Sequence, residues 1–300
     1  MASVSFMIDG SHNNLITTHN HSFERFFHSL NNQGYHLEQT KKKQDLDRAL
    51  SKHAKIFMIG VPQTSFYTQE EINTILEFVR TGGSLLVFHR FGGDVLQKTN
   101  LNQLLSHFGV FSENTLVCSK NNIGIKSLPI ISSFSENLVM QNLKKLILPG
   151  ACSLRISRDA HMLCETDEDA WIEMYKPHQF EWINEHPKSR SAIGAYSIYG
   201  QGHVIVLGTP DFLNNNEYYG LPSLDNQRFF LNLLKWLTRP VSEVETKDWI
   251  LQQLGNLSEQ MVKINKNMKQ MKDLMLSYDK RLRDLEMKFY ELNGIHFPKK

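Results

Sequence analysis

The sequence has no excess of charge of either sign. It carries 33 Lys and Arg against 31 Asp and Glu, a formal net charge of +2, and residues 241–300 are balanced as well, with 11 basic and 9 acidic side chains. Proteins that bind nucleic acid through phosphate contacts concentrate Lys and Arg on one surface. We therefore expect no nucleic-acid partner.

Cysteines are few, and long apolar runs are absent. Cys118, Cys152 and Cys164 form no C-x-x-C pair, which disfavours a disulfide scaffold or a structural zinc site and favours a reduced, cytoplasmic setting. No stretch approaches the roughly 18 apolar residues of a membrane span. The N-terminal MASVSFMIDG has neither the basic nor the apolar region of a secretion signal. We expect a cytoplasmic protein without membrane insertion.

Short apolar runs alternate with helical patterns over the first hundred residues, which is typical of βαβ units and a parallel sheet. Thr68 and Glu71 form a T-x-x-E capping box that predicts the start of a helix, and Gly82 with Gly83 predicts its end. The expected strands are 4–9, 35–39, 55–62 and 84–89, and the expected helices are 22–34, 45–53 and 68–81.

The pattern becomes irregular after residue 101, with a short helix and short strand-like pieces. Residues 191–213 then predict a hairpin, with the turn at Tyr199-Gly200-Gln201-Gly202. An amphipathic helix over 224–238 ends at Arg239 and Pro240. We expect residues 1–240 to form one α/β domain.

A different periodicity begins after Pro240, where Ser242 and Glu245 form a second capping box. Apolar side chains then recur at alternating spacings of four and three residues, the pattern of the a and d positions of a left-handed coiled coil. We call these residues the seam: Ile250, Leu254, Leu257, Met261, Ile264, Met268, Met271, Met275, Tyr278, Leu282, Leu285, Phe289 and Leu292.

The seam predicts that residues 241–300 form a coiled-coil helix that pairs with a second helix. We favour a parallel homodimer, in which Arg281 at a g position meets Glu286 at an e position of the partner helix. A heteromeric coiled coil with another protein is the close alternative, because charges at e and g positions are sparse. A helix folded back on its own domain is a further alternative, although such helices usually have a wider apolar stripe.

Several stretches together resemble a known family, the GIFT domain shared by intraflagellar transport protein 52 and gliding-motility protein G. They are the Y-T-x-x-E helix start, the GGSLLV strand and the late G-x-G-x-V-x-V-L-G hairpin, and the resemblance covers roughly residues 3–238. It implies a flavodoxin-like, class I glutamine-amidotransferase-like fold, an α/β architecture with a mostly parallel sheet and helices on both faces. It also implies a non-catalytic branch that serves as a scaffold subunit of a multiprotein assembly. The coiled coil lies outside it.

An amidotransferase-like site needs a nucleophile on the sharp turn that follows a central strand, and a histidine base oriented by a carboxylate. Here the strand leads into His89-Arg90-Phe91-Gly92-Gly93, which contains no Cys, Ser or Thr, and His203 has no acidic residue near it in sequence. We therefore expect no enzyme, no cofactor and no metal; His12, His19 and His21 lack the spacing of a metal site.

The carboxyl ends of the strands offer a place for a ligand crevice without a catalyst. One interpretation is structural, with Arg90 paired to Asp94 and His89 satisfied within its loop. The other is a small polar, sugar-like ligand or a residual hydrolase that uses loop 89–94. The candidate crevice residues are Asp9, Ser11, His12, Asn13, Gln63, His89, Arg90, Asp94 and Asp211. Our main hypothesis is a non-catalytic scaffold protein whose GIFT-like domain is presented by a coiled coil.

Overall fold

The computed structural model of the chain describes residues 4–42, 46–52, 54–157, 159–186 and 190–293. It contains two compact units, Met1–Trp249 and Ile250–Lys300. The first unit is a mixed α/β domain. The second unit contains most of the long helix α7 (Glu243–Leu292), whose first turns belong to the first unit.

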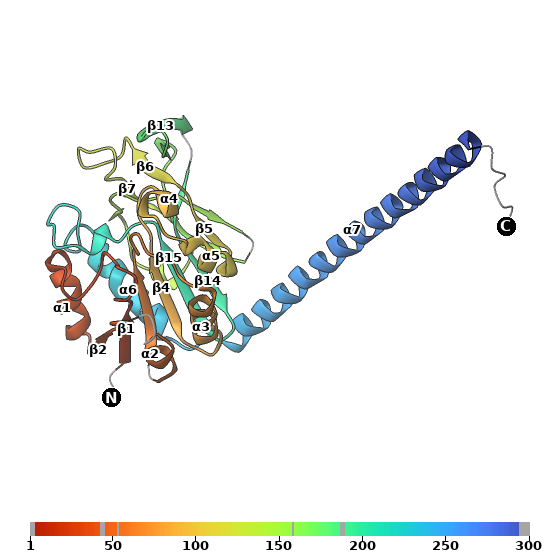
Figure 1. Cartoon of the computed structure of the whole chain (residues 1–300). Helices are drawn as coiled ribbons and strands as arrows, with labels where there is room; N and C mark the ends of the chain where they lie inside the picture. Colours follow the sequence, from red (N-terminus) through yellow and green to blue (C-terminus); the bar gives the residue numbers. More distant parts are fainter. Residues whose placement is uncertain (1–3, 43–45, 53, 158, 187–189, 294–300) are drawn as a thin grey trace. The chain divides into compact units, whose positions relative to one another are not determined.

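The α/β domain is built on one eight-stranded sheet in the order β2-β1-β3-β4-β15-β14-β11-β8 (Figure 1). The first five strands run parallel, and the last three continue the sheet in antiparallel fashion. The expectation of a large, mostly parallel sheet is therefore confirmed. The strand bounds in sheet order are β2 Tyr35–Gln39, β1 Val4–Ile8, β3 Ala54–Gly60, β4 Ser84–Phe88, β15 Gly202–Leu207, β14 Ala192–Tyr199, β11 His161–Glu165 and β8 Ser133–Phe134.

Helices cover both faces of this sheet. Successive side chains of a strand point to opposite faces, and here both sets are apolar, so each strand contributes to two core clusters. Phe6 belongs to one core cluster and the next residue, Met7, to the other. The Phe6 cluster includes residues of α1 (Glu24–Asn32) and α6 (Asn226–Thr238). The Met7 cluster includes residues of α2 (Leu46–Lys52), α3 (Gln69–Arg80) and α5 (Leu101–Leu105). Burial on both faces explains why the parallel strands read as continuous apolar runs.

The capping signals of the sequence are realised in the structure. Thr68 accepts a hydrogen bond from the backbone N–H of Glu71, and the Glu71 carboxylate accepts one from the backbone of Thr68. The predicted hairpin is also present: β14 pairs antiparallel with β15 through Tyr199 opposite Gly202, and Gly200 has the positive φ of +62° that its tight turn requires.

Shorter elements lie beside the main sheet. A second sheet joins β13 (Glu181–His186), β12 (Ala170–Lys176) and β6 (Thr115–Ser119). Two strand pairs, β5 (Val110–Ser112) with β10 (Leu154–Ile156) and β7 (Ile130–Ile131) with β9 (Leu146–Ile147), and the short helix α4 (Gly93–Gln97) complete the domain.

The first turns of α7 belong to the α/β unit. Ser242 and Glu245 form the predicted capping box, and Arg239 makes two hydrogen bonds to the Glu245 carboxylate, at 3.0 and 2.5 Å. The ring of Trp249 lies edge-on to that of Tyr199, with centroids 5.7 Å apart. No helix in the described part of the chain has the length and apolar character needed to cross a membrane.

Candidate functional site

The nine candidate crevice residues all lie near the carboxyl ends of parallel strands, but they do not form one crevice. They divide into a buried network around Asp9, a bridge between Asn13 and Gln63, and two separate side-chain pairs, His89–Asp94 and Arg90–Asp211, in the loops that follow β4 and β15. The network and the two pairs differ in burial and therefore in what they can do.

Asp9, at the end of β1, is fully buried and accepts hydrogen bonds on both carboxylate oxygens. Its Oδ2 atom accepts from His12 Nδ1 at 2.9 Å, from Asn14 at 3.0 Å and from the Tyr67 hydroxyl at 2.5 Å. Its Oδ1 atom accepts from the backbone and hydroxyl of Ser11 at 2.9 and 2.7 Å, and from Thr40 at 3.3 Å. Burial alone would raise the pKa of Asp9, but the hydrogen bonds and the charge of His12 outweigh it and lower that pKa to about 2.

The other side of His12 faces α3. Its ring stacks on that of Tyr67 with centroids 3.8 Å apart, and its Nε2 atom lies 3.2 Å from Glu71 Oε1. That contact is electrostatic rather than a hydrogen bond, because both atoms lack a partner with hydrogen-bond geometry. Asp9 and His12 have no exposed surface, so their side chains fix the loop after β1 and are not accessible to a ligand. Asn14, Thr40, Tyr67 and Glu71 are members that sequence reasoning missed.

A second contact holds neighbouring loops together. The Asn13 side chain donates to the backbone carbonyl of Gln63 at 2.9 Å, and Gln63 lies 3.5 Å from Gln97 across the next loop. These residues connect the loops after β1 and β3 to α4, which is a structural role.

The expected pairing of Arg90 with Asp94 is wrong. Asp94 pairs with His89 at 3.0 Å and accepts hydrogen bonds from the first backbone N–H groups of α5, those of Leu101 and Asn102. Arg90 pairs instead with Asp211, which follows β15 and lies 121 positions later, at 3.1 Å. The strand order explains the difference, because β4 and β15 are direct neighbours and their carboxyl ends meet.

The Arg90–Asp211 pair lines a cavity of about 380 Å³ at this edge of the sheet. The wall comes from the loop after β1, the loop after β4, the loop after β15 and the segments around 127 and 150. The lining residues are Leu15, Asn20, Ser22, Phe23, Arg90, Phe91, Ser127, Leu128, Pro149, Gly150, Asp211, Asn214 and Tyr219. Of the nine predicted crevice residues, Arg90 and Asp211 are the two that the structure brings to this cavity.

The three cysteines are all free and buried. Burial raises the pKa of Cys118 and of Cys164 to about 12, and it raises that of Cys152 further. Because the thiolate is the nucleophilic form, all three are unreactive thiols at neutral pH. Among the described residues, no group of three or more His, Cys, Asp or Glu side chains is arranged to hold a metal ion.

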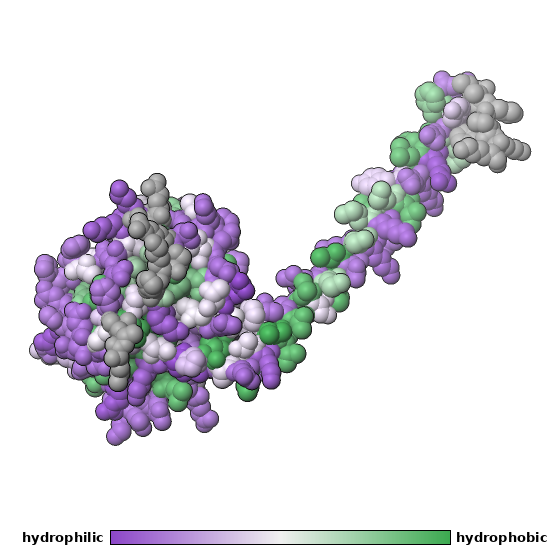
Figure 2. All heavy atoms as spheres, turned by 90° about the horizontal axis from the view of Figure 1, so that it is seen from below, coloured by the Kyte–Doolittle hydropathy of each residue, from purple (hydrophilic) through white to green (hydrophobic). Residues whose placement is uncertain are grey.

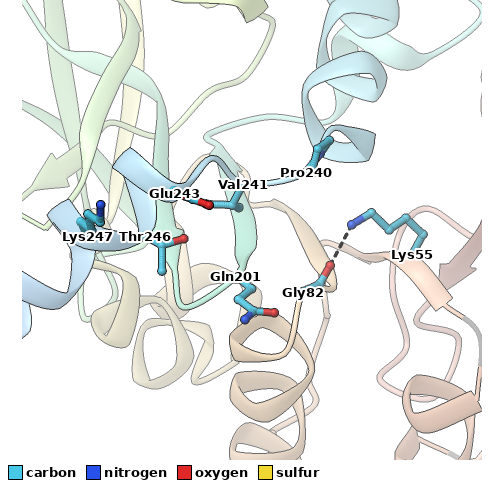
Figure 3. A pocket seen from close by; sticks show the side chains of 8 residues that line it. All are labelled: Lys55, Gly82, Gln201, Pro240, Val241, Glu243, Thr246 and Lys247. Carbon is cyan, nitrogen blue, oxygen red and sulfur yellow. Dashed lines mark hydrogen bonds between the residues drawn. The ribbon is translucent and has the colours of Figure 1, made fainter.

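A second cavity, of about 540 Å³, lies at the opposite edge of the sheet, where the parallel strands begin. Figure 3 shows the residues that line it. Its wall includes Lys55 at the start of β3, Gln201 at the start of β15, and Pro240 and Lys247 near the start of α7. Lys55 donates to the backbone carbonyl of Gly82 at 2.8 Å. Ligands of α/β sheets bind at the carboxyl ends of strands, whereas this cavity lies where the strands begin.

His203, considered above as a possible base, lies wholly inside the domain near that edge. Its ring packs edge-on against Trp236 with centroids 4.3 Å apart, and neither ring nitrogen has a hydrogen-bond partner among the described residues. Burial lowers the pKa of His203 to about 4, and the nearby charge of Arg239 acts in the same direction. His203 is therefore a neutral core residue at pH 7.

This burial predicts an acid-dependent loss of stability. The unfolded chain binds a proton at His203 near pH 6.5 and the folded chain only near pH 4, so stability rises with pH between these values. His203→Phe is expected to remove about 3 kcal/mol from the difference in unfolding free energy between pH 7 and pH 4. Urea denaturation at both pH values measures this difference. His178→Phe, at an exposed position, is the control and should behave like the unaltered chain; equal pH dependence in all three proteins would contradict the prediction.

The seam is exposed along the whole of α7. Its side chains range from 46% exposed at Ile250 to 86% at Leu292. Figure 2 shows apolar side chains repeating along the helix between polar ones. The predicted long helix is confirmed, and as a single chain it leaves its apolar stripe in contact with solvent.

The comparisons with known proteins agree with this fold. Residues 23–234 match the model of a family described as "Domain of unknown function (DUF4350)". The chain belongs to this family. The match spans the α/β domain from the start of α1 into α6 and leaves α7 outside it. A comparison with curated proteins finds no match.

A solved structure shares the fold of the DUF4350 domain. The structure described as the mmIFT52 N-terminal domain has a TM-score of 0.64 at 18% identity, covering 78% of this chain and 97% of that chain. This confirms the GIFT-like fold expected from the sequence. A cytoplasmic protein from Salmonella typhimurium (TM-score 0.49, 11% identity, covering 79% of this chain and 99% of that one) and a ThuA-like protein from Bacteroides uniformis (0.47, 13%, 78% and 91%) are more distant.

Proposed function

We propose that this protein is a non-catalytic scaffold, in which the coiled coil of α7 presents two copies of the DUF4350 domain to a larger assembly. The observation that carries the proposal is the seam: thirteen apolar side chains at heptad spacing on one helix of 50 residues, all exposed in the single chain. A helix of this length extends about 75 Å. Monomeric proteins rarely leave so large an apolar surface in contact with water.

The chemistry of the α/β domain supports a role without catalysis. The turn after β4 contains no nucleophilic side chain, the cysteines are buried with raised pKa values, and His12 and His203 are fully buried. The parallel strands follow the order β2-β1-β3-β4-β15, which matches the order of flavodoxin-like sheets. We infer a flavodoxin-like, amidotransferase-like domain whose ancestral site has lost its nucleophile.

Pairing would raise the effective affinity of the protein for an extended or repeated target, because two linked domains bind it together. We favour a parallel homodimer in the cytoplasm, with Arg281 opposite Glu286 of the partner helix. The similarity to the mmIFT52 N-terminal domain makes an assembly related to intraflagellar transport or gliding machinery the context that we propose.

Light scattering on the full chain and on residues 1–249 tests the proposal. The cut follows the compact unit, since a cut at 240 would remove Glu245 from Arg239 and Trp249 from Tyr199. We expect the full chain to be a dimer at about 10 µM, well above the Kd of a stable coiled coil, and residues 1–249 to be a monomer that keeps its thermal unfolding transition. A full chain with the mass of one copy, 34.8 kDa, at this concentration would refute self-association.

A further inference from the structure

The cavity that Arg90 and Asp211 line has the volume and the position of a small-molecule site, and this inference goes beyond the proposed scaffold function. Its volume of about 380 Å³ falls in the range of ligand pockets, roughly 300–1,000 Å³. It lies at the carboxyl ends of β1, β4 and β15, where α/β sheets bind ligands. The remaining question is which chemistry it would accept.

The electrostatics of the cavity favour a neutral ligand. Arg90 and Asp211 are the charged residues of the described wall, one of each sign, and they pair with each other. The side chains are 28% and 15% exposed, so the pair is largely removed from water. An anion that approaches Arg90 is repelled by the adjacent Asp211 carboxylate, and a cation that approaches Asp211 is repelled by the adjacent Arg90 guanidinium. A charged ligand therefore gains little net attraction from the pair and still loses its own hydration, which is unfavourable.

The pair nevertheless keeps hydrogen-bonding capacity. Arg90 uses Nε and Nη2 on the same oxygen, Asp211 Oδ2. In the described part of the chain neither Arg90 Nη1 nor Asp211 Oδ1 has a hydrogen-bond partner. Neither atom is among the buried polar atoms that lack a partner, so both are accessible to solvent. The site thus presents one N–H donor and one carboxylate acceptor together, which complements a ligand that has an acceptor beside a donor.

Aromatic rings and uncharged polar side chains share the rest of the wall. The Arg90 guanidinium lies 4.8 Å from the centroid of the Phe91 ring, and that ring is supported by Trp182 with centroids 6.1 Å apart. Phe23 and Tyr219 also line the cavity. Aromatic rings stack on planar ligands, and the polar side chains beside them can hydrogen-bond the edge of such a ligand.

We propose that this cavity binds a neutral, planar small molecule that carries a carboxamide-like edge, with its carbonyl toward Arg90 and its N–H toward Asp211.

Three probes of similar shape but different charge test this class of ligand: benzamide (neutral), benzoate (anionic) and benzamidine (cationic). For a ligand of about nine heavy atoms, the expected Kd of benzamide is on the order of 1 mM. Ligand-observed NMR titration of the full chain measures it, and benzoate and benzamidine should bind at least about fivefold more weakly.

Two substitutions should change the preferred charge. Asp211→Asn leaves Arg90 unpaired, so benzoate should gain about tenfold in affinity, and Arg90→Gln leaves Asp211 unpaired, so benzamidine should gain about tenfold. Ser127→Phe is the third variant: it fills the cavity from a wall residue whose side chain makes no hydrogen bond among the described residues, and it should abolish benzamide binding. Thermal unfolding checks the fold of each variant, and Ser127→Phe keeps the test decisive if a charge variant does not fold.

The proposal is overturned by either of two results. One is benzamide binding that does not saturate below about 20 mM or that Ser127→Phe leaves unchanged, since the probe is then not in the cavity. The other is an unaltered chain that prefers benzoate or benzamidine, since the ion pair would then not set the charge of the ligand.

Discussion

Asp9→Ala is expected to lower the free energy of unfolding by about 3–5 kcal/mol, the usual cost of removing one partner of a buried ion pair. The substitution leaves His12, Asn14 and the Tyr67 hydroxyl without the acceptor that they share, in a site with no exposed surface. Urea denaturation at pH 7 measures the change. Asp47→Ala, at an exposed position in α2, is the control and should change stability by less than about 0.5 kcal/mol.

The same network has a pH signature. The pKa of Asp9 is about 2 in the folded chain against 3.8 for an ordinary aspartate, so its stabilising contribution is complete above about pH 4 and is lost as the pH falls toward 2. This contribution corresponds to about 2 kcal/mol, and Asp9→Ala should lack it. If Asp9→Ala were within about 1 kcal/mol of the unaltered chain, the network would not fix the loop after β1 as described.

Met268→Lys is expected to weaken self-association at least about hundredfold, which is roughly 3 kcal/mol. Met268 is an a position in the middle of the seam, so a dimer would place two lysine ammonium groups against each other in its apolar core. Sedimentation equilibrium across micromolar concentrations measures the Kd of the dimer.

The matched control is Met287→Lys, the same substitution on the same helix at an f position outside the seam. Both methionines are exposed in the single chain, 63% for Met268 and 46% for Met287, so neither change should unfold the helix. We expect Met287→Lys to dimerise like the unaltered chain. Equal weakening by both variants would mean that net charge rather than the seam controls assembly.

Local signals in the sequence predicted the elements well. These signals are the two capping boxes, the hairpin turn around Gly200 and the seam. Each depends on residues within a few positions of one another, so a short segment contains all the interactions that define it. The site was predicted less well. Its members were expected at the strand ends, but their partners come from distant positions: Tyr67 lies 58 positions from Asp9, and Asp211 lies 121 positions from Arg90.

The sequence by itself determined the α/β class, the helix starts and the coiled-coil periodicity of residues 250–292, because periodic burial and backbone capping are local requirements. Only the tertiary structure decided which charges meet. Because β15 lies beside β4, Asp211 pairs with Arg90. Asp94 instead contacts His89 and the backbone N–H groups at the start of α5. The physical reason is that a buried charge takes the partner that the sheet order brings within hydrogen-bond distance, and the order of strands in a sheet is not encoded in any short stretch of residues.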